Sequence, residues 1–251
     1  MKKRFLILSL SLFIICSFNI LAINFPEKAN KVEEFIPKGW KKLIVKKGDL
    51  NKDKIDDVVL VIQKTDSKNF RKAESPFYMP IDNANFNPII MLVLFKDKDK
   101  NFQYKLVAKN EDGFIVPEGK SHEEVLQILE DSNPISIKNN TLKIRTYFQA
   151  IRAVDSTEYI FRYQNNRFEL IGLEAKSYGT SGSYIEDSIY SINFSTKKLE
   201  KYILMEDMTS GKTVKEEKVV ESIDIEHKYI LDAMTEATAS EILDKYVYKS
   251  N

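Results

Sequence analysis

A short stretch of alternating oxygen-bearing side chains leads directly into an apolar run, and it constrains the fold more than any other part of the chain. Carboxylate or amide oxygens occur at Asp49, Asn51, Asp53 and Asp57, and Ile55 offers its backbone carbonyl between them. Calcium takes roughly 6 to 8 oxygen ligands, and alternate positions of a tight loop can turn several of them toward one point. We therefore predict a calcium-binding loop. The alternative is a polar turn whose carboxylates accept hydrogen bonds from their own backbone.

The loop resembles those of integrin-type FG-GAP repeats and the related VCBS-type bacterial repeats, in which D-x-[DN]-x-D-G-x-x-D precedes a strand. It is less similar to an EF-hand, because position 12 is Leu60 instead of Glu and a strand follows instead of a helix. The family's Gly at position 6 is Lys54 here, and the required backbone angle costs a non-glycine residue about 1 kcal/mol. Together with the like charges of Lys46, Lys47 and Lys52, this predicts weak binding, with a Kd of roughly 10⁻⁴ to 10⁻³ M.

A looser resemblance extends over most of the chain. Residues 35–40, 56–62, 161–172 and 191–198 are similar to segments of a group of exported bacterial proteins of unassigned function. The likeness implies a single domain with one calcium-type loop near its N-terminus, and it implies no activity.

The first residues have the pattern of an export signal. Three basic residues at positions 2–4 precede an apolar run over residues 5–15, and Ala22 ends a plausible cleavage site. We predict a signal peptide over residues 1–22, a mature chain from Ile23, and a periplasmic or secreted location. Two alternatives are a lipoprotein attached through Cys16, although the preceding residues lack the small side chain that its processing requires, and a retained anchor.

Charge and cysteine content exclude two classes of function. Without residues 1–22 the chain has 35 basic and 37 acidic residues, a net charge of −2. Nucleic acid is therefore not an expected partner, since phosphate binding needs a basic face. Because Cys16 is the only cysteine, the mature chain has no disulfide and no thiol chemistry. Membrane contact is expected only through the signal peptide or a lipid anchor.

The remaining pattern is that of a mainly β protein. Residues 58–62 and 89–95 are continuous apolar runs, typical of strands buried on both faces, and residues 102–108 alternate in polarity. Three hairpins are predicted, two of them around Asn pairs, which tolerate the positive φ that tight hairpin turns need. We expect a single domain over residues 23–251, built as an antiparallel meander with a sandwich-like or propeller-like arrangement and a looser segment at 23–34.

Two short peripheral α-helices are predicted from capping boxes. Residues 121–124 precede apolar residues at helical spacing over 125–129, and residues 238–241 precede a second apolar stripe. The second stripe consists of Ile242, Leu243, Tyr246 and Val247. Both stripes are interpreted as packing faces laid on the sheet.

A long connection at residues 65–88 is the candidate recognition surface. It carries four aromatic residues, Phe70, Phe77, Tyr78 and Phe86, directly after the predicted strand that follows the calcium loop. Connections longer than about 12 to 15 residues are usually functional or disordered, and exposed aromatic side chains supply binding contacts or stack on sugars. The alternative is a segment that folds back and buries these rings in the core.

Nothing in the sequence indicates catalysis. Neither His122 nor His227 has neighbours typical of a triad or a zinc site, and no phosphate-binding glycine motif occurs. We therefore predict a non-catalytic exported protein that binds a protein or glycan partner. The alternative is a carboxylate-based hydrolase of envelope polymers that uses acidic pairs such as 56/57, 123/124 or 186/187.

Overall fold

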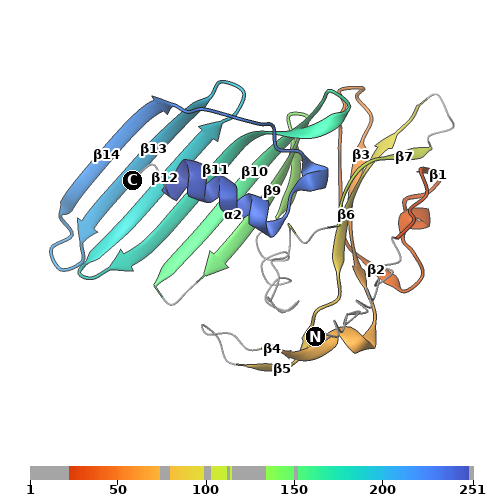
Figure 1. Ribbon diagram of the computed structural model, residues 1–251, viewed down its shortest axis with the longest axis horizontal. Coiled ribbons are helices and arrows are strands. Elements are labelled where there is room, and N and C mark those ends of the chain that lie inside the picture. Colours follow the sequence, from red (N-terminus) through yellow and green to blue (C-terminus); the bar gives the residue numbers. More distant parts are fainter. Residues whose placement is uncertain are drawn as a thin grey trace, which may run out of the picture.

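The computed structural model describes residues 23–73, 80–98, 103–111, 114, 134–149 and 152–248 (Figure 1). It confirms the predicted fold class, because the protein is mainly β and its sheets are antiparallel. The predicted signal peptide and the predicted helix at residues 121–129 lie outside the described residues.

A five-stranded sheet holds the two apolar runs at its centre. Its strand order is β1 (Lys28–Ala29), β7 (Tyr104–Asn110), β6 (Ile89–Lys96), β3 (Asp57–Lys64) and β2 (Trp40–Gly48). Val59 and Val61 face one core, whereas Val58, Leu60 and Ile62 face another, because successive side chains of a strand point to opposite faces. The prediction that these strands are buried on both faces is confirmed.

The segment predicted to be looser, residues 23–34, packs on this sheet instead. β1 pairs with β7, a short 3₁₀ helix, η1, follows at Val32–Phe35, and the side chains of Phe25, Ala29 and Phe35 are buried. These three residues cover the face formed by Leu60 and its neighbours. The sequence predicts a looser segment because charged and polar residues separate its apolar residues.

The second sheet is a seven-stranded meander. In spatial order it consists of β8 (Ile135–Lys138), β9 (Thr141–Gln149), β10 (Ala153–Gln164), β11 (Arg167–Ser181), β12 (Tyr184–Asn193), β13 (Lys198–Asp207) and β14 (Thr213–Ser222). The three predicted hairpins are present. The Asn pairs at 139–140 and 165–166 have positive φ, as their turns require.

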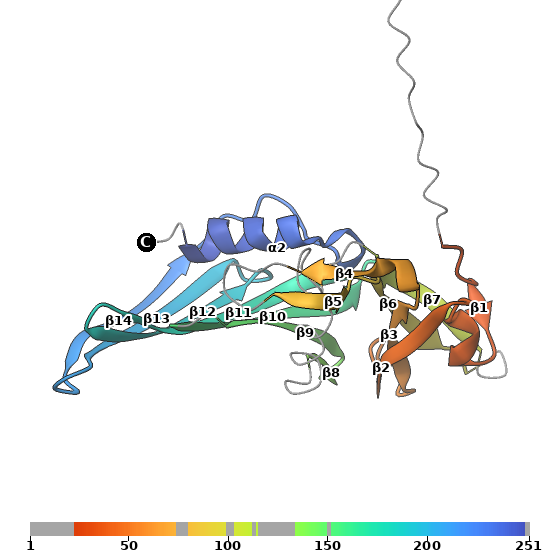
Figure 2. The same cartoon turned by 90° about the horizontal axis from the view of Figure 1, so that it is seen from below.

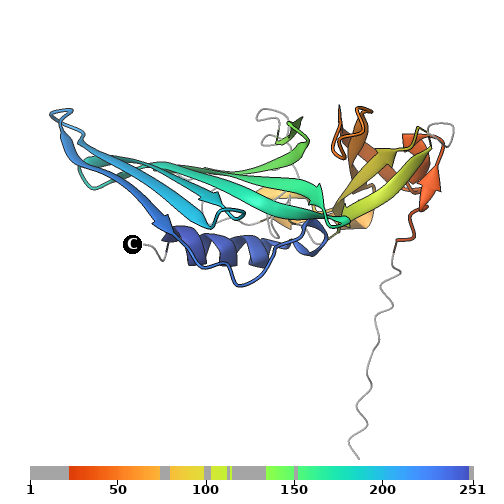
Figure 3. The same ribbon diagram turned by 90° about the horizontal axis from the view of Figure 1, so that it is seen from above.

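The C-terminal segment covers one face of the meander (Figures 2 and 3). It contains a 3₁₀ turn, η3 (Leu231–Ala233), the helix α2 (Glu236–Leu243) and a π-helical turn, η4 (Asp244–Tyr248). The predicted stripe is confirmed, since Ile242, Tyr246 and Val247 are buried. The predicted N-cap at residue 238 is wrong, because the hydroxyl of Thr235 accepts the backbone N–H of Thr238 at 3.0 Å. No described helix is long and apolar enough to cross a membrane.

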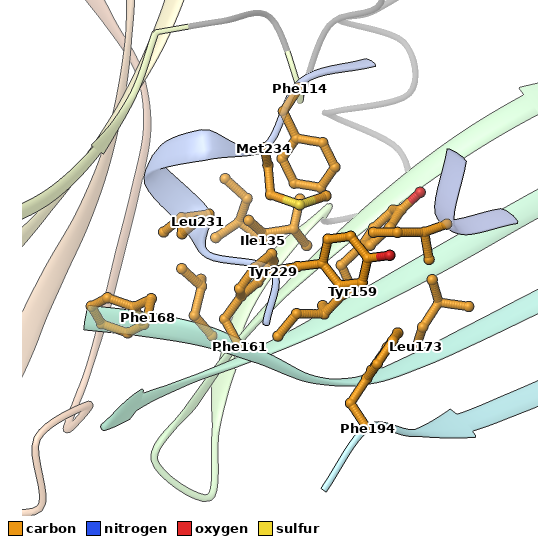
Figure 4. Packing of buried hydrophobic residues seen from close by; sticks show 14 of the residues in the cluster. Phe114, Ile135, Tyr159, Phe161, Phe168, Leu173, Phe194, Tyr229, Leu231 and Met234 are labelled. Atoms are coloured by element: carbon orange, nitrogen blue, oxygen red, sulfur yellow. The ribbon is translucent and has the colours of Figure 1, made fainter. Parts of the chain in front are cut away.

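One large core joins the two sheets and the C-terminal segment (Figure 4). Phe114 packs edge-on against Tyr159 of β10, with the ring centroids 4.9 Å apart. Met234 and Leu231 come from the C-terminal segment, and Val59 comes from β3. Because these side chains share one core, the five-stranded sheet and the meander stabilise each other.

The connection predicted as a long loop at 65–88 contains a small hairpin. A 3₁₀ turn, η2 (Ser67–Asn69), leads into β4 (Phe70–Ala73), which pairs with β5 (Ile81–Asn85). Asn87 is buried and holds the base of this hairpin. Its side-chain oxygen accepts the backbone N–H of Asp66 at 2.9 Å, and its side-chain NH₂ donates to the backbone C=O of Asp66 at 3.0 Å.

Candidate functional site

The predicted calcium loop connects β2 to β3, and its polar side chains are held against the loop itself. The carboxylate of Asp49 accepts the backbone N–H groups of Lys52 at 2.6 Å and Lys54 at 3.0 Å. The Asn51 amide donates to a carboxylate oxygen of Asp53 at 3.0 Å and accepts that residue's backbone N–H at 2.9 Å. Asp49 is therefore bonded to the two lysine N–H groups, and Asn51 and Asp53 are bonded to each other, all within the same loop.

The backbone of this loop is left-handed at two lysines. Lys54 has a φ of 68°, which confirms that a side chain stands where the turn favours glycine, and Lys52 has a φ of 71°, which was not predicted. Both residues donate their N–H groups to Asp49. These bonds compensate part of the cost of the left-handed conformation.

Asp57 differs from the other predicted ligands because it is fully buried. One carboxylate oxygen accepts the N–H of Leu50 at 2.9 Å, and the other accepts the N–H of Lys96, on β6, at 3.1 Å. The pKa of Asp57 is raised to about 6, mainly by burial. The two N–H bonds oppose this rise, and the negative charges of Asp53 and Asp49 add to it. Asp57 thus fastens the base of the loop to the neighbouring strand.

The loop also lies where the two sheets meet. Leu50 is buried in the large core, and the backbone carbonyl of Asp49 accepts the side-chain N–H of Asn140 at 2.9 Å. Asn140 belongs to the turn between β8 and β9, and β8 approaches β2 beside Gly48. Sequence reasoning missed this joint, because about ninety residues separate Asp49 from Asn140 and no local pattern links them.

The loop retains oxygen atoms that suit a hard cation. A carboxylate has about four lone-pair sites, so one N–H bond to each oxygen leaves acceptor capacity on Asp49 and Asp53. The side-chain oxygen of Asn51 and the backbone carbonyl oxygen of Ile55 are two further predicted metal ligands. Among the described residues, no three His, Cys, Asp or Glu side chains form a metal-binding group. The calcium site therefore stays a prediction.

The predicted aromatic surface is split by the structure. Phe70 lies on β4 and is 40% exposed. Phe86 follows β5, and the guanidinium of Arg71 lies over its ring, 4.3 Å from the centroid. Phe77 and Tyr78 lie outside the described residues. Phe70 is therefore the exposed aromatic residue in the described part of this hairpin.

Sequence reasoning missed a tyrosine-bearing face of the meander, here called the open sheet face. Its side chains come from two rows of directly paired residues: Tyr147, Ser156, Lys176, Ile189, Tyr202 and Lys218 in the first row, and Val154, Tyr178, Asp187, Leu204 and Glu216 in the second. α2 lies on the other face, and no described helix or strand covers this one (Figure 2). The sequence of β12 carries a signal for this face, because apolar residues occur on both sides of the strand. Ile185 and Ile189 point to one side, and Tyr190 and Ile192 point to the other.

The acidic pairs named for a hydrolase do not face one another in the described residues. Glu186 and Asp187 are neighbours on β12, so they project to opposite faces of the sheet. Asp56 is exposed, whereas Asp57 is buried beneath the loop. The pair at 123/124 lies outside the described residues.

Comparison of the chain with family models, with curated proteins and with solved structures gave no match. The functional assignment therefore depends on the residues themselves. The three features that bear on it are the calcium-type loop, the β4–β5 hairpin and the open sheet face.

Proposed function

We propose that this chain is an exported, non-catalytic protein that binds a glycan on its open sheet face. The observation that supports this most directly is the presence of Tyr147, Tyr178 and Tyr202 on one uncovered face, on three different strands. Tyr178 is 52% exposed. The basic and apolar residues at the chain start support export.

The chemistry of this face suits an extended sugar chain. Tyrosine rings stack on the apolar faces of sugars while their hydroxyl groups stay hydrogen-bonded. The hydroxyl of Tyr202 lies 3.5 Å from a carboxylate oxygen of Glu216, and Lys176 and Asp187 supply further polar groups within the same two rows. A broad sheet surface favours a polymer that lies along it over a small molecule that needs enclosure.

We expect the double substitution Tyr178→Ala and Tyr202→Ala to weaken glycan binding. Each stacked ring contributes roughly 0.5–1.5 kcal/mol, so the two together correspond to about a tenfold to hundredfold rise in Kd. The measurement is binding of the purified protein to an array of bacterial envelope glycans, followed by titration of the best ligand. Tyr184→Ala is the control, because Tyr184 is 37% exposed on β12 but faces the other side of the sheet. Absence of any bound glycan, or an equal loss in the control, contradicts the proposal.

We further propose that the loop binds calcium weakly and that the ion stabilises the joint between the sheets. The ligands would be Asp49, Asn51, Asp53 and the carbonyl of Ile55, with Asp57 at the base. Two observations support this proposal. The side-chain oxygens of Asp49, Asn51 and Asp53 each accept a backbone N–H of the same short loop, and the carbonyl of Asp49 contacts the second sheet through Asn140.

We expect millimolar calcium to raise the melting temperature of the protein. An ion present at ten times its Kd adds about 1.4 kcal/mol to the free energy of unfolding, which corresponds to roughly 3–6 °C for a chain of this length. Asp49→Ala combined with Asp53→Ala should abolish the rise, whereas Asp56→Ala, an exposed carboxylate of the same loop outside the ligand set, should preserve it. No calcium-dependent shift in the unmodified protein would identify the loop as a polar turn.

A further inference from the structure

A hollow of about 370 Å³ on the five-stranded sheet gathers basic side chains from separate elements. Lys31 precedes η1, while Lys42 and Lys47 lie on β2. Tyr104 of β7 forms another wall. The hollow lies on the sheet face that the N-terminal segment covers, apart from the open sheet face and from the β4–β5 hairpin.

The hollow has a net positive charge. None of Lys31, Lys42 and Lys47 forms an ion pair with a carboxylate in the described part of the chain. Glu33 is the one acidic residue among its described lining residues. Three ammonium groups beside one carboxylate favour an anionic ligand. This positive charge is local, because the whole chain has nearly equal numbers of basic and acidic residues.

One side of the hollow is apolar. Val45 and Tyr104 line it and pack against the smaller core, and both are partly exposed. The ammonium of Lys96 lies 5.7 Å from the centroid of the Tyr104 ring. A volume of about 370 Å³ is within the usual range for small-molecule sites and much larger than a bare phosphate needs. The hollow therefore has room for an organic part beside an anionic group.

We propose that this hollow binds a phosphorylated sugar, with the phosphate among Lys31, Lys42 and Lys47 and the sugar ring against Tyr104. Separate ammonium groups act as point charges around a multi-oxygen anion, whereas a planar carboxylate is better matched by the fork of an arginine, and no arginine lines the described part of the hollow. The site is separate from the proposed glycan surface, whereas Lys47 lies two residues before Asp49 of the calcium-type loop.

The test is calorimetric titration of the purified protein with glucose 1-phosphate, inorganic phosphate and glucose. Glucose 1-phosphate should bind, inorganic phosphate should bind more weakly, and glucose should not bind. Lys42→Gln with Lys47→Gln should weaken glucose 1-phosphate binding at least about tenfold, which is about 1.4 kcal/mol. Lys38→Gln with Lys41→Gln is the matched control, because it removes the same charge from exposed residues of the same segment outside the hollow.

A further variant separates the two parts of the ligand. Tyr104→Leu should weaken glucose 1-phosphate binding while leaving the affinity for inorganic phosphate unchanged, since only the sugar contacts the ring. The proposal is overturned if glucose 1-phosphate does not bind, if glucose binds equally well, or if the control pair loses as much affinity as the Lys42/Lys47 pair. Circular dichroism of each variant establishes that the fold is retained.

Discussion

Replacing Glu169 by Gln should lower the free energy of unfolding by about 3 kcal/mol at pH 7. The side chain is 3% exposed, and its carboxylate accepts four hydrogen bonds. The donors are Gln164 at 2.6 Å, Asn165 at 3.1 Å, Arg167 at 3.0 Å and Lys228 at 3.0 Å. An uncharged amide cannot accept all four, so buried hydrogen bonds are lost, and Arg167 and Lys228, which are 44% and 58% exposed, lose their counterion.

The size of this effect follows from the pKa of Glu169. Burial raises this pKa, but the hydrogen bonds outweigh burial and lower it from 4.5 to about 2. A carboxyl group with a lowered pKa stabilises the folded state above its unfolded pKa, and it loses that contribution as the pH falls from 4.5 toward 2. A shift of this size corresponds to about 3 kcal/mol, or roughly 6–12 °C in melting temperature.

Urea unfolding of both proteins between pH 2 and pH 7 tests this result. The difference between the unmodified protein and Glu169→Gln should be full at pH 7 and should shrink steadily below pH 4.5. Glu174→Gln is the control, because its ion pair with Lys176 is 43% and 53% exposed. Exposed pairs contribute about 0–1 kcal/mol. A difference that does not change with pH would contradict the proposed role of the charge.

Glu169 also shows why the C-terminal segment stays on the meander. Lys228, which donates to its carboxylate, belongs to that segment, and the neighbouring backbone adds a bond from the N–H of Leu170 to the carbonyl of Tyr229 at 2.9 Å. Tyr229 and Leu231 then enter the large core. One buried carboxylate thus links the turn between β10 and β11 to the segment that leads into α2.

The parts of the fold that could be predicted are those determined by neighbouring residues. Continuous apolar runs identified β3 and β6, because a strand buried on both faces leaves a pattern within itself. The Asn pairs identified two turns, because their side chains tolerate positive φ. The position of Lys54 predicted its left-handed backbone for a similar local reason.

The remaining features depend on partners far along the chain. β14 has exposed residues at nearly every position, so its alternation is weak and only its pairing with β13 defines it. The hollow lined by Lys31, Lys42 and Lys47 forms only because the fold places β1, β2 and β7 beside η1. The spacing of the oxygen-bearing side chains in the loop is visible in the sequence, whereas the burial of Asp57 and its bond to Lys96 depend on the neighbouring β6.

Replacing Gly48 by Ala should destabilise the joint between the sheets by about 1–3 kcal/mol, the usual cost of overpacking. A Cβ at this position would lie 2.7 Å from Cγ2 of Ile137 and 3.0 Å from its Cβ, closer than packed carbon atoms approach. Ile137 lies on β8 and packs against the large core, so it cannot move without disturbing that core. The cost is steric, because only a β-carbon is added.

A double-mutant cycle with Ile137→Ala separates this clash from a general effect of removing glycine. The second substitution removes the closest atom, so the two changes should be coupled by about 1–2 kcal/mol, with Gly48→Ala less harmful in the Ile137→Ala background. Gly172→Ala is the control, because a Cβ there would come no closer than 3.4 Å to a neighbour. If the two substitutions are additive, β2 and β8 are not in close contact. The loop that follows Gly48 would then lose its support from the second sheet, and calcium binding could stabilise only the loop itself.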